Sequence, residues 1–281
     1  MVISLARYLF AFSAAAFIVF LSIDANAQVT IAPTALFIDD QSRFGSFLVL
    51  NGSNEAQEVS LLFEFGYPDT DDEGNSYMNY EDEEARVRYS MADWIRGFPR
   101  NFILAPGERQ TVRLTVRPPG EVSEGTYWTR IKTVSNPAVP DIDEEVTEGV
   151  QAQITFRFEQ VTAGFYKRGN VTTGIHFNDL AVDVYDNQGI VRARVERTGN
   201  SPFLGSIFLI VRDANNNVVY EHRTSTTVYI DAVRRIEFDA SELPPGSYTA
   251  EVRFESWRPD ISSSDIVQAD DAIQQTTFNV P

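Results

Sequence analysis

The amino-acid sequence predicts an all-β protein built from two antiparallel β-sandwiches in tandem. Short runs rich in β-branched and aromatic residues recur along the chain with turn residues between them, and no stretch keeps a helical period with caps at both ends. The strand pattern also starts again after a glycine-containing segment at residues 164–174. A chain of 281 residues, 43% of them hydrophobic and 22% charged, is long and apolar enough to fill the cores of two such domains.

The first 27 residues have the pattern of a secretory signal peptide. Arg7 precedes an apolar run from Tyr8 to Ile23. Ala25 and Ala27 then supply the small residues expected before a cut at Gln28. The run is shorter than the roughly 20 residues that span a bilayer, which favours cleavage over a membrane anchor. We therefore expect the mature chain to be soluble outside the cytoplasm.

Six runs predict the strands of the first sandwich: Thr30 to Ile38, Phe44 to Asn51, Glu58 to Phe65, Gln110 to Arg117, Thr126 to Val134 and Gln151 to Glu159. Alternation along two of these runs predicts which side chains share a face. In one run these are Phe44, Ser46, Leu48 and Leu50, and in the other they are Val112, Leu114 and Val116.

Seven runs predict the strands of the second sandwich: Ala181 to Tyr185, Ile190 to Arg197, Ser206 to Arg212, Val218 to Arg223, Arg234 to Phe238, Ser247 to Glu255 and Ile273 to Val280. A Pro-Gly turn at Pro245-Gly246 stands just before a strand that opens with Tyr248, as at the tyrosine corner of immunoglobulin-like sandwiches. We therefore predict two immunoglobulin-like β-sandwich domains after a cleaved signal peptide, over residues 28–168 and 169–281.

Composition excludes most function classes. The chain carries 23 Lys and Arg against 40 Asp and Glu, and its net charge of −17 opposes binding to a phosphate backbone, so nucleic acid is not an expected partner. The absence of Cys, with only two His, excludes thiol nucleophiles, disulfides and Cys/His zinc sites. Nucleotide-binding, hydrolase and metalloprotease motifs are also missing. We expect no enzyme, no cofactor and no resident metal, with glycosidase-type carboxylate pairs the one catalytic arrangement left open.

The segment Asp69 to Gly74 imitates the start of a calcium loop, with acids at its first, third and fifth positions and glycine at the sixth. The twelfth position is Tyr80 where the loop requires Glu. With Glu81 to Glu84 close behind, the pattern favours a solvated acidic loop over a cation site.

The cleanest two-residue period in the chain lies in Val150 to Glu159. One face carries Val150, Ala152, Ile154, Phe156 and Phe158, and the other face is polar. Such a strand either packs against its own core or, as an edge strand, templates a strand of another protein. The alternation alone leaves both interpretations open.

An ordered set of segments resembles the periplasmic chaperones that assemble pili and fimbriae, as a divergent member. The segments are Ile31 to Phe37, Phe47 to Ser53, Ala92 to Arg96, Pro99 to Glu108, Gln110 to Leu114 and Glu124 to Arg130. They cover the first domain, about half of the chain. The resemblance implies an L-shaped pair of immunoglobulin-like sandwiches.

The resemblance also implies a function. Members bind incomplete pilin subunits and lend the final strand of their first domain to fill the gap, without ATP. By position this donor strand is Val150 to Glu159, about residues 150–160, with Val150, Ala152, Ile154, Phe156 and Phe158 entering the groove of the subunit. The implied partners are pilin-like secreted subunits and an outer-membrane assembly pore, and the implied location is the periplasm.

Other residues gain expected roles only through the resemblance. Arg113 and Glu124 match an internal ion pair that braces the first domain. The family's two basic residues that hold the carboxylate of the subunit match Thr34 and Ala163, which are uncharged. Lys167 and Arg168 lie a few residues further on and are the candidates for this carboxylate anchor.

A rival interpretation is a secreted structural or adhesive protein whose tandem immunoglobulin-like domains bind a surface partner. In that case the strand at Val150 to Glu159 is wholly internal to its own sandwich. A third arrangement pairs the donor-strand edge with a second copy of the chain, which protects an exposed edge.

Overall fold

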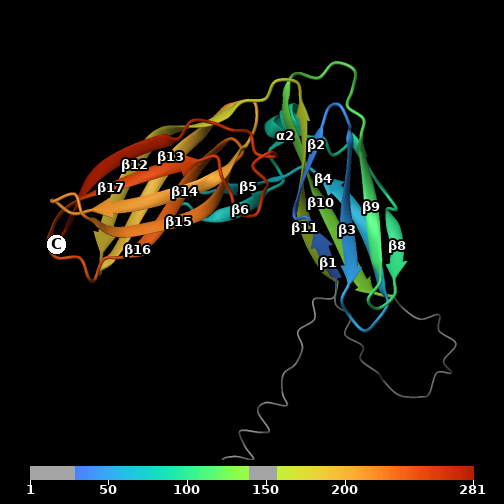
Figure 1. Ribbon diagram of the computed structural model, residues 1–281, viewed down its shortest axis with the longest axis horizontal. Helices are drawn as coiled ribbons and strands as arrows, with labels where there is room; N and C mark the ends of the chain where they lie inside the picture. Colours follow the sequence, from blue (N-terminus) through green and yellow to red (C-terminus); the bar gives the residue numbers. More distant parts are fainter. Residues whose placement is uncertain (1–28, 139–156) are drawn as a thin grey trace, which may run out of the picture.

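The computed structural model describes residues 29–138 and 157–281, and the predicted signal peptide lies outside them. The predicted all-β class is confirmed, because the described residues form strands throughout, with α2 (Glu83–Tyr89) as a short helix. Figure 1 shows two elongated β-sandwiches that meet at a corner, with α2 close to it. Within the described ranges, no helix is long and apolar enough to cross a bilayer.

The first sandwich packs a four-stranded sheet on a five-stranded one. In spatial order, the first sheet consists of β1 (Val29–Ala32), β3 (Phe44–Asn51), β9 (Arg109–Val116) and β7 (Ile95–Phe98). The second consists of β2 (Ala35–Asp39), β11 (Phe158–Arg168), β10 (Gly125–Pro137), β4 (Gln57–Glu64) and β8 (Asn101–Leu104). The predicted first run is thus two strands, β1 and β2, that belong to different sheets.

The two groups of side chains that alternation predicts in this sandwich point in different directions. Val112, Leu114 and Val116 are buried in its core, as predicted. In β3 the predicted residues do share a face, but it is the opposite face that enters the core, through Phe47 and Val49, while Phe44 is 47% exposed. Both faces of β3 carry apolar side chains, so the alternation in the sequence does not select one.

The second sandwich packs a three-stranded sheet on a four-stranded one. The first sheet consists of β12 (Thr173–Tyr185), β13 (Gln188–Gly199) and β16 (Asp231–Asp239). The second consists of β15 (Val218–Val228), β14 (Phe203–Arg212), β17 (Gly246–Glu255) and β18 (Ala272–Val280). Their facing side chains form one core that includes Val195, Leu209, Val211, Val252 and Phe254. No strand is shared between the sheets of the two sandwiches among the described residues.

Both sandwiches contain a tyrosine corner. The Tyr248 hydroxyl donates to the carbonyl of Pro244 at 2.7 Å, which confirms the predicted corner. Tyr127 in the first sandwich makes the equivalent bond to the carbonyl of Ser123 at 2.9 Å. In each case a glycine stands two residues before the tyrosine, so the pattern Gly-x-Tyr is the sequence signal that would have found both corners.

The predicted acidic loop is a β-hairpin followed by a helix. β5 (Tyr67–Thr70) pairs with β6 (Ser76–Asn79), and the Asp71 carboxylate accepts hydrogen bonds from the backbone of Glu73 and Asn75 inside the turn. The hydrogen bond from the Asn75 side chain, together with these backbone bonds, lowers the pKa of Asp71. The carboxylate oxygens of Asp71 therefore close the turn. In the described part of the chain, no group of His, Cys, Asp and Glu side chains is placed to hold a metal ion.

The acidic residues that follow the hairpin begin the helix α2. Asp82 is its N-cap and accepts from the backbone N–H of Ala85 at 2.9 Å. Glu83 and Glu84 occupy the first turn, where carboxylates complement the helix dipole. The sequence did not indicate this helix, because its seven residues are too few for a recognisable period.

The hairpin β5–β6 extends from the first sandwich onto the second, where it lies beside the edge strand β16 (Figure 1). The Thr70 hydroxyl accepts a hydrogen bond from the backbone N–H of Val233 at 2.8 Å. Asp72 and Arg194 form an ion pair at 3.1 Å. Gly74 has a positive φ of 86°, and a Cβ atom there would lie 2.8 Å from Cβ of Arg235. The hairpin is therefore fitted closely against the second sandwich.

A cluster of buried aromatic side chains, the junction cluster, joins the two sandwiches. Its members are Phe65, Tyr67, Trp128 and Phe165 from the first sandwich and Leu204 and Tyr229 from the second, with Ala85 of α2. The ring of Tyr229 lies 5.0 Å from that of Trp128 and 5.6 Å from that of Tyr67. Aromatic contacts of this kind add to the stabilisation that burial gives, so the sandwiches are held by a packed contact as well as by the chain.

Candidate functional site

The candidate site is the outer edge of β11, where the sheet lacks a neighbouring strand. β11 pairs with β10 along its whole length, from Phe158 opposite Ser135 to Arg168 opposite Gly125. On its other side, β2 pairs only with Ala163–Lys167. Among the described residues, the four positions Glu159–Thr162 therefore have a strand on one side only. Backbone groups on the open side of such an edge are available to pair with an added strand.

The predicted donor residues lie at and before the start of this edge. Phe158 is the first residue of β11 and is 42% exposed. Val150, Ala152, Ile154 and Phe156 lie outside the described residues. The strand also continues further than the predicted run, which stops at Glu159. Gly164 lies inside it, where a Cβ atom would be 3.1 Å from Cε of Met91, so this glycine serves close packing and does not mark a boundary.

A row of three side chains, the outer row, crosses the sheet next to this edge. Leu62 on β4 and Val161 on β11 both stand opposite Lys132 on β10. Leu62 is 41% exposed and Val161 is 45% exposed, so aliphatic side chains face solvent on both sides of Lys132. Sequence reasoning missed this row, because its three members come from strands that are far apart in the chain.

Two carboxylates hold the amine of Lys132 in the outer row. Its Nζ atom lies 2.5 Å from Glu64 and 3.3 Å from Glu159, above the ring of Tyr80. The hydrogen bond to Glu64 is the main cause of the raised pKa of Lys132. This network links β4, β10 and β11, and it fixes the outer row beside the open edge.

The two positions that match the family's basic anchor are neighbours in the structure. The backbone N–H of Ala163 donates to the carbonyl of Thr34 at 3.2 Å. The strand residue opposite Ala163 on β10 is Arg130, which is only 7% exposed. Arg130 donates through Nε to the carbonyl of Gly66 at 2.9 Å and lies over the ring of Tyr229. The guanidinium of Arg130 therefore lies in the contact between the two sandwiches.

The two candidate anchor residues differ in their surroundings. Lys167 donates to the backbone carbonyl of Asp265 in the second sandwich and lies over the ring of Phe37. Desolvation lowers the pKa of Lys167, as expected for an amine in an apolar contact. Arg168, the next residue, makes no ion pair within 4.0 Å among the described residues. Its positive charge contributes to the lowered pKa of Asp40.

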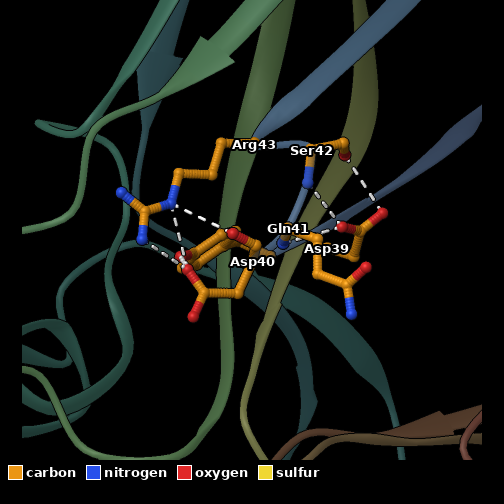
Figure 2. Close-up of polar contacts among 6 residues, drawn as sticks. Asp39, Asp40, Gln41, Ser42 and Arg43 are labelled. Carbon is orange, nitrogen blue, oxygen red and sulfur yellow. Dashed lines mark hydrogen bonds and ion pairs between the residues drawn. The ribbon is translucent and has the colours of Figure 1, made fainter.

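Asp40 belongs to the turn between β2 and β3 that anchors the end of β11 (Figure 2). The Asp39 carboxylate accepts from the backbone of Gln41 and Ser42, and the Asp40 carboxylate pairs with Arg43 at 2.9 Å. The Tyr166 hydroxyl of β11 donates to Asp40 at 2.5 Å. Burial, followed by this bond, raises the pKa of Tyr166 to about 12. The turn thus fixes one end of β11, opposite to the end where its edge is open.

The predicted ion pair between Arg113 and Glu124 is not formed, although both residues are described. Arg113 lies on β9 in the four-stranded sheet, where its neighbours Val112 and Leu114 point into the core. Glu124 precedes β10 of the other sheet and packs against Gly169, where a Cβ atom would lie 2.5 Å from its side chain. Arg113 is therefore exposed on a strand of one sheet, whereas Glu124 is exposed just before the first residue of a strand of the other.

No protein-family model and no curated protein matches the chain. Among solved structures, the YadV chaperone is similar at 10% identity and a TM-score of 0.49, over 90% of this chain and 100% of that one. The CsuC–CsuE chaperone–tip adhesin complex of Acinetobacter baumannii is similar at 10% identity and a TM-score of 0.43, with 89% and 98% covered. The CupB2 chaperone of Pseudomonas aeruginosa is similar at 10% identity and a TM-score of 0.41, with 89% and 100% covered. At these identities, function has to be inferred from the residues of the chain itself.

Proposed function

We propose that the protein is a periplasmic chaperone that binds incomplete β-sandwich subunits, such as pilin-like subunits of a surface fibre, by donating a strand. The observation that carries the proposal is the open edge of β11 at Glu159–Thr162, directly after the alternating segment Val150 to Phe158. A subunit that lacks one strand has a matching open edge and an unfilled apolar groove. Strand addition satisfies both at once.

The open edge at Glu159–Thr162 and the alternating segment Val150 to Phe158 supply different parts of the interaction. Backbone pairing along the edge gives affinity that depends little on sequence, and alternate side chains in the groove give specificity. Three or four inserted side chains, at about 1.5–3 kcal/mol each, provide on the order of 5–12 kcal/mol before association costs. This is enough to shield a subunit and still allow it to be exchanged. The scheme uses no nucleotide, which agrees with the absence of a nucleotide-binding motif.

The outer row supports the same location for the partner. Val161 presents an aliphatic side chain on the open edge itself, where an added strand would lie beside it, whereas Leu62 lies two strands further into the sheet. Lys167 is engaged with the second sandwich, which leaves Arg168 as the better placed of the two predicted cations.

Affinity purification of the tagged protein from the periplasm of its own host tests the proposal. Phe156→Glu places a charge on the apolar face of the donor segment, and Thr155→Glu places the same charge on its polar face. We expect small secreted β-rich subunits to co-purify with the wild type and with Thr155→Glu, and to be lost with Phe156→Glu.

Thermal unfolding of the three proteins separates loss of binding from loss of the fold. The proposal requires Phe156→Glu to keep the melting temperature of the wild type. A Phe156→Glu variant that unfolds would place Phe156 in the protein's own core. An empty wild-type eluate from fibre-producing cells would favour the structural or adhesive alternative instead.

A further inference from the structure

A groove with an unusual charge lies on the second sandwich, away from the β11 edge. It runs between β15 and β16, which are edge strands of the two sheets, and residues of the β5–β6 hairpin close one side of it. Its volume is about 330 Å³. The residues with polar side chains that line this arginine groove are Arg234, Arg235, Arg258, Ser76, Thr224, Ser225, Thr226 and Thr227.

The arginine groove is positive in a strongly acidic protein. Three guanidinium groups and no Asp or Glu line it, although the chain carries 40 acidic residues against 23 basic ones. Two of the three have a carboxylate partner outside the lining: Arg258 pairs with Asp260 at 2.6 Å and Arg235 with Glu237 at 2.5 Å. Arg234 forms no ion pair within the described residues; burial lowers the pKa of its guanidinium, and the nearby Asp69 opposes that shift.

Two buried polar atoms of the groove residues have no hydrogen-bond partner. They are Nε of Arg234 and the hydroxyl oxygen of Thr226, whose residue is only 6% exposed. A second donor of Arg234 is used by the carbonyl of Thr227. Buried polar groups are normally paired, and those that are not call for a specific explanation, such as an ion absent from the structure. Here the unpaired groups are hydrogen-bond donors, and one of them belongs to a guanidinium that forms no ion pair among the described residues.

We propose that the arginine groove binds a small molecule through an oxyanion group, a phosphate or a carboxylate. Arg234 is the central ligand and Thr226 donates its hydroxyl hydrogen, with Arg235 and Arg258 adding positive charge from the sides. Guanidinium groups match the geometry of phosphate and carboxylate oxygens, and their hydrogen bonds to ionised acceptors are the stronger kind. The proposal stands independently of strand donation.

Binding in the groove has a second consequence, because its walls come from both halves of the protein. Ser76 and Gly74 belong to the hairpin of the first sandwich, and the arginines belong to the second. A ligand that contacts both sides binds the docked hairpin better than a detached one. It therefore stabilises the contact between the sandwiches, and the melting temperature rises with ligand concentration.

Titration of the purified protein with inorganic phosphate, and separately with succinate, tests the proposal at constant ionic strength. We expect saturable binding of at least one anion by calorimetry, with a rise in melting temperature. The anion that binds distinguishes a phosphate ligand from a carboxylate ligand. Arg234→Met should weaken binding at least tenfold, and the charge-matched control Arg212→Met on β14, outside the groove lining, should leave it unchanged. Failure of both anions to saturate at millimolar concentration would overturn the proposal, as would equal loss in the two variants.

Thr226→Val gives a second test that does not depend on the tolerance of the fold to loss of Arg234. The hydroxyl of Thr226 has no partner in the folded protein, so its replacement by a methyl group should leave the melting temperature equal or higher. The same change should weaken anion binding severalfold. Unchanged affinity in this variant would remove Thr226 from the site and contradict the assignment.

Discussion

Two sheet edges in this protein differ in what lies beside them. The edge of β16 in the second sandwich is covered by the β5–β6 hairpin, whose Thr70 accepts a bond from the backbone of Val233. The edge of β11 in the first sandwich is left open over Glu159–Thr162 within the described residues. Exposed edges promote unwanted pairing, and proteins normally cover or interrupt them. The proposed strand donation makes use of the second of these edges.

The largest expected effect comes from breaking the contact that holds the covered edge in place. Trp128→Ala removes the most buried large ring of the junction cluster, which is 1% exposed and stacks on Tyr89 at 4.8 Å. We expect a loss of about 3–5 kcal/mol in the free energy of unfolding, measured by chemical denaturation. The control Trp257→Ala removes a ring that is 43% exposed. Equal losses in the two variants would show that the cluster does not hold the sandwiches together.

The hairpin itself should contribute less. Thr70→Val keeps the shape of the side chain and removes the acceptor of the Val233 N–H bond, which should cost about 1–2 kcal/mol. Amide hydrogen exchange at Val233 should become faster, because its partner is lost. Thr115→Val on β9, an exposed threonine with no such bond, is the matched control. Unchanged exchange at Val233 would mean that the hairpin does not protect the β16 edge.

The stability of the contact between the hairpin and β16 should also depend on pH. Burial, followed by repulsion from Asp69, raises the pKa of Asp231 at the start of β16, with Arg194 opposing and Glu196 adding to the shift. A carboxyl group with a raised folded-state pKa destabilises the fold when ionised, so this group should add stability as the pH falls from 7 through that pKa. Asp231→Asn should remove this part of the pH dependence of the melting temperature, whereas Asp213→Asn, in an exposed turn, should not. A pH profile identical to that of the wild type would contradict the assignment.

The smallest effect on stability is expected at the open edge. Val161→Glu changes a side chain that is 45% exposed and stands opposite Lys132, so the free energy of unfolding should stay within about 0.5 kcal/mol of the wild type. Capture of subunits should nevertheless fall, because the partner strand would meet a charge. The two edges would then differ in function: substitutions beside β16 would change the free energy of unfolding, and substitutions on β11 would change subunit binding. A large loss of stability in Val161→Glu would show that this edge is structural.

The sequence predicts local features of the fold well and long-range ones poorly. Alternation located the core face of β9, and the Pro-Gly-x-Tyr pattern located the corner at Tyr248. In β3 alternation grouped the side chains correctly but did not indicate which group enters the core, because Phe44 and Phe47 make both faces apolar and only packing selects between them. Sequence reasoning failed for the hairpin, since nothing in Asp69 to Gly74 reveals that the turn lies against another domain.

The candidate site was predictable in part. The sequence located the alternating segment that ends at Phe158, but the open edge depends on where β2 stops pairing, at Ala163, which is a property of two distant segments. The outer row and the arginine groove combine residues from several strands for the same reason. The expected pair of Arg113 and Glu124 came from resemblance alone, and the structure places Arg113 on β9 and Glu124 just before β10, which belongs to the other sheet.

Hydrogen exchange along β11, in the free protein and in the complex purified from the host, tests strand donation most directly. The account predicts that backbone amides on the open side of Glu159–Thr162 exchange rapidly in the free protein and become protected in the complex. Amides of β16 should be protected in both states, because the hairpin covers that edge already. Unchanged exchange in Glu159–Thr162, with new protection elsewhere on the protein, would contradict strand donation at this edge.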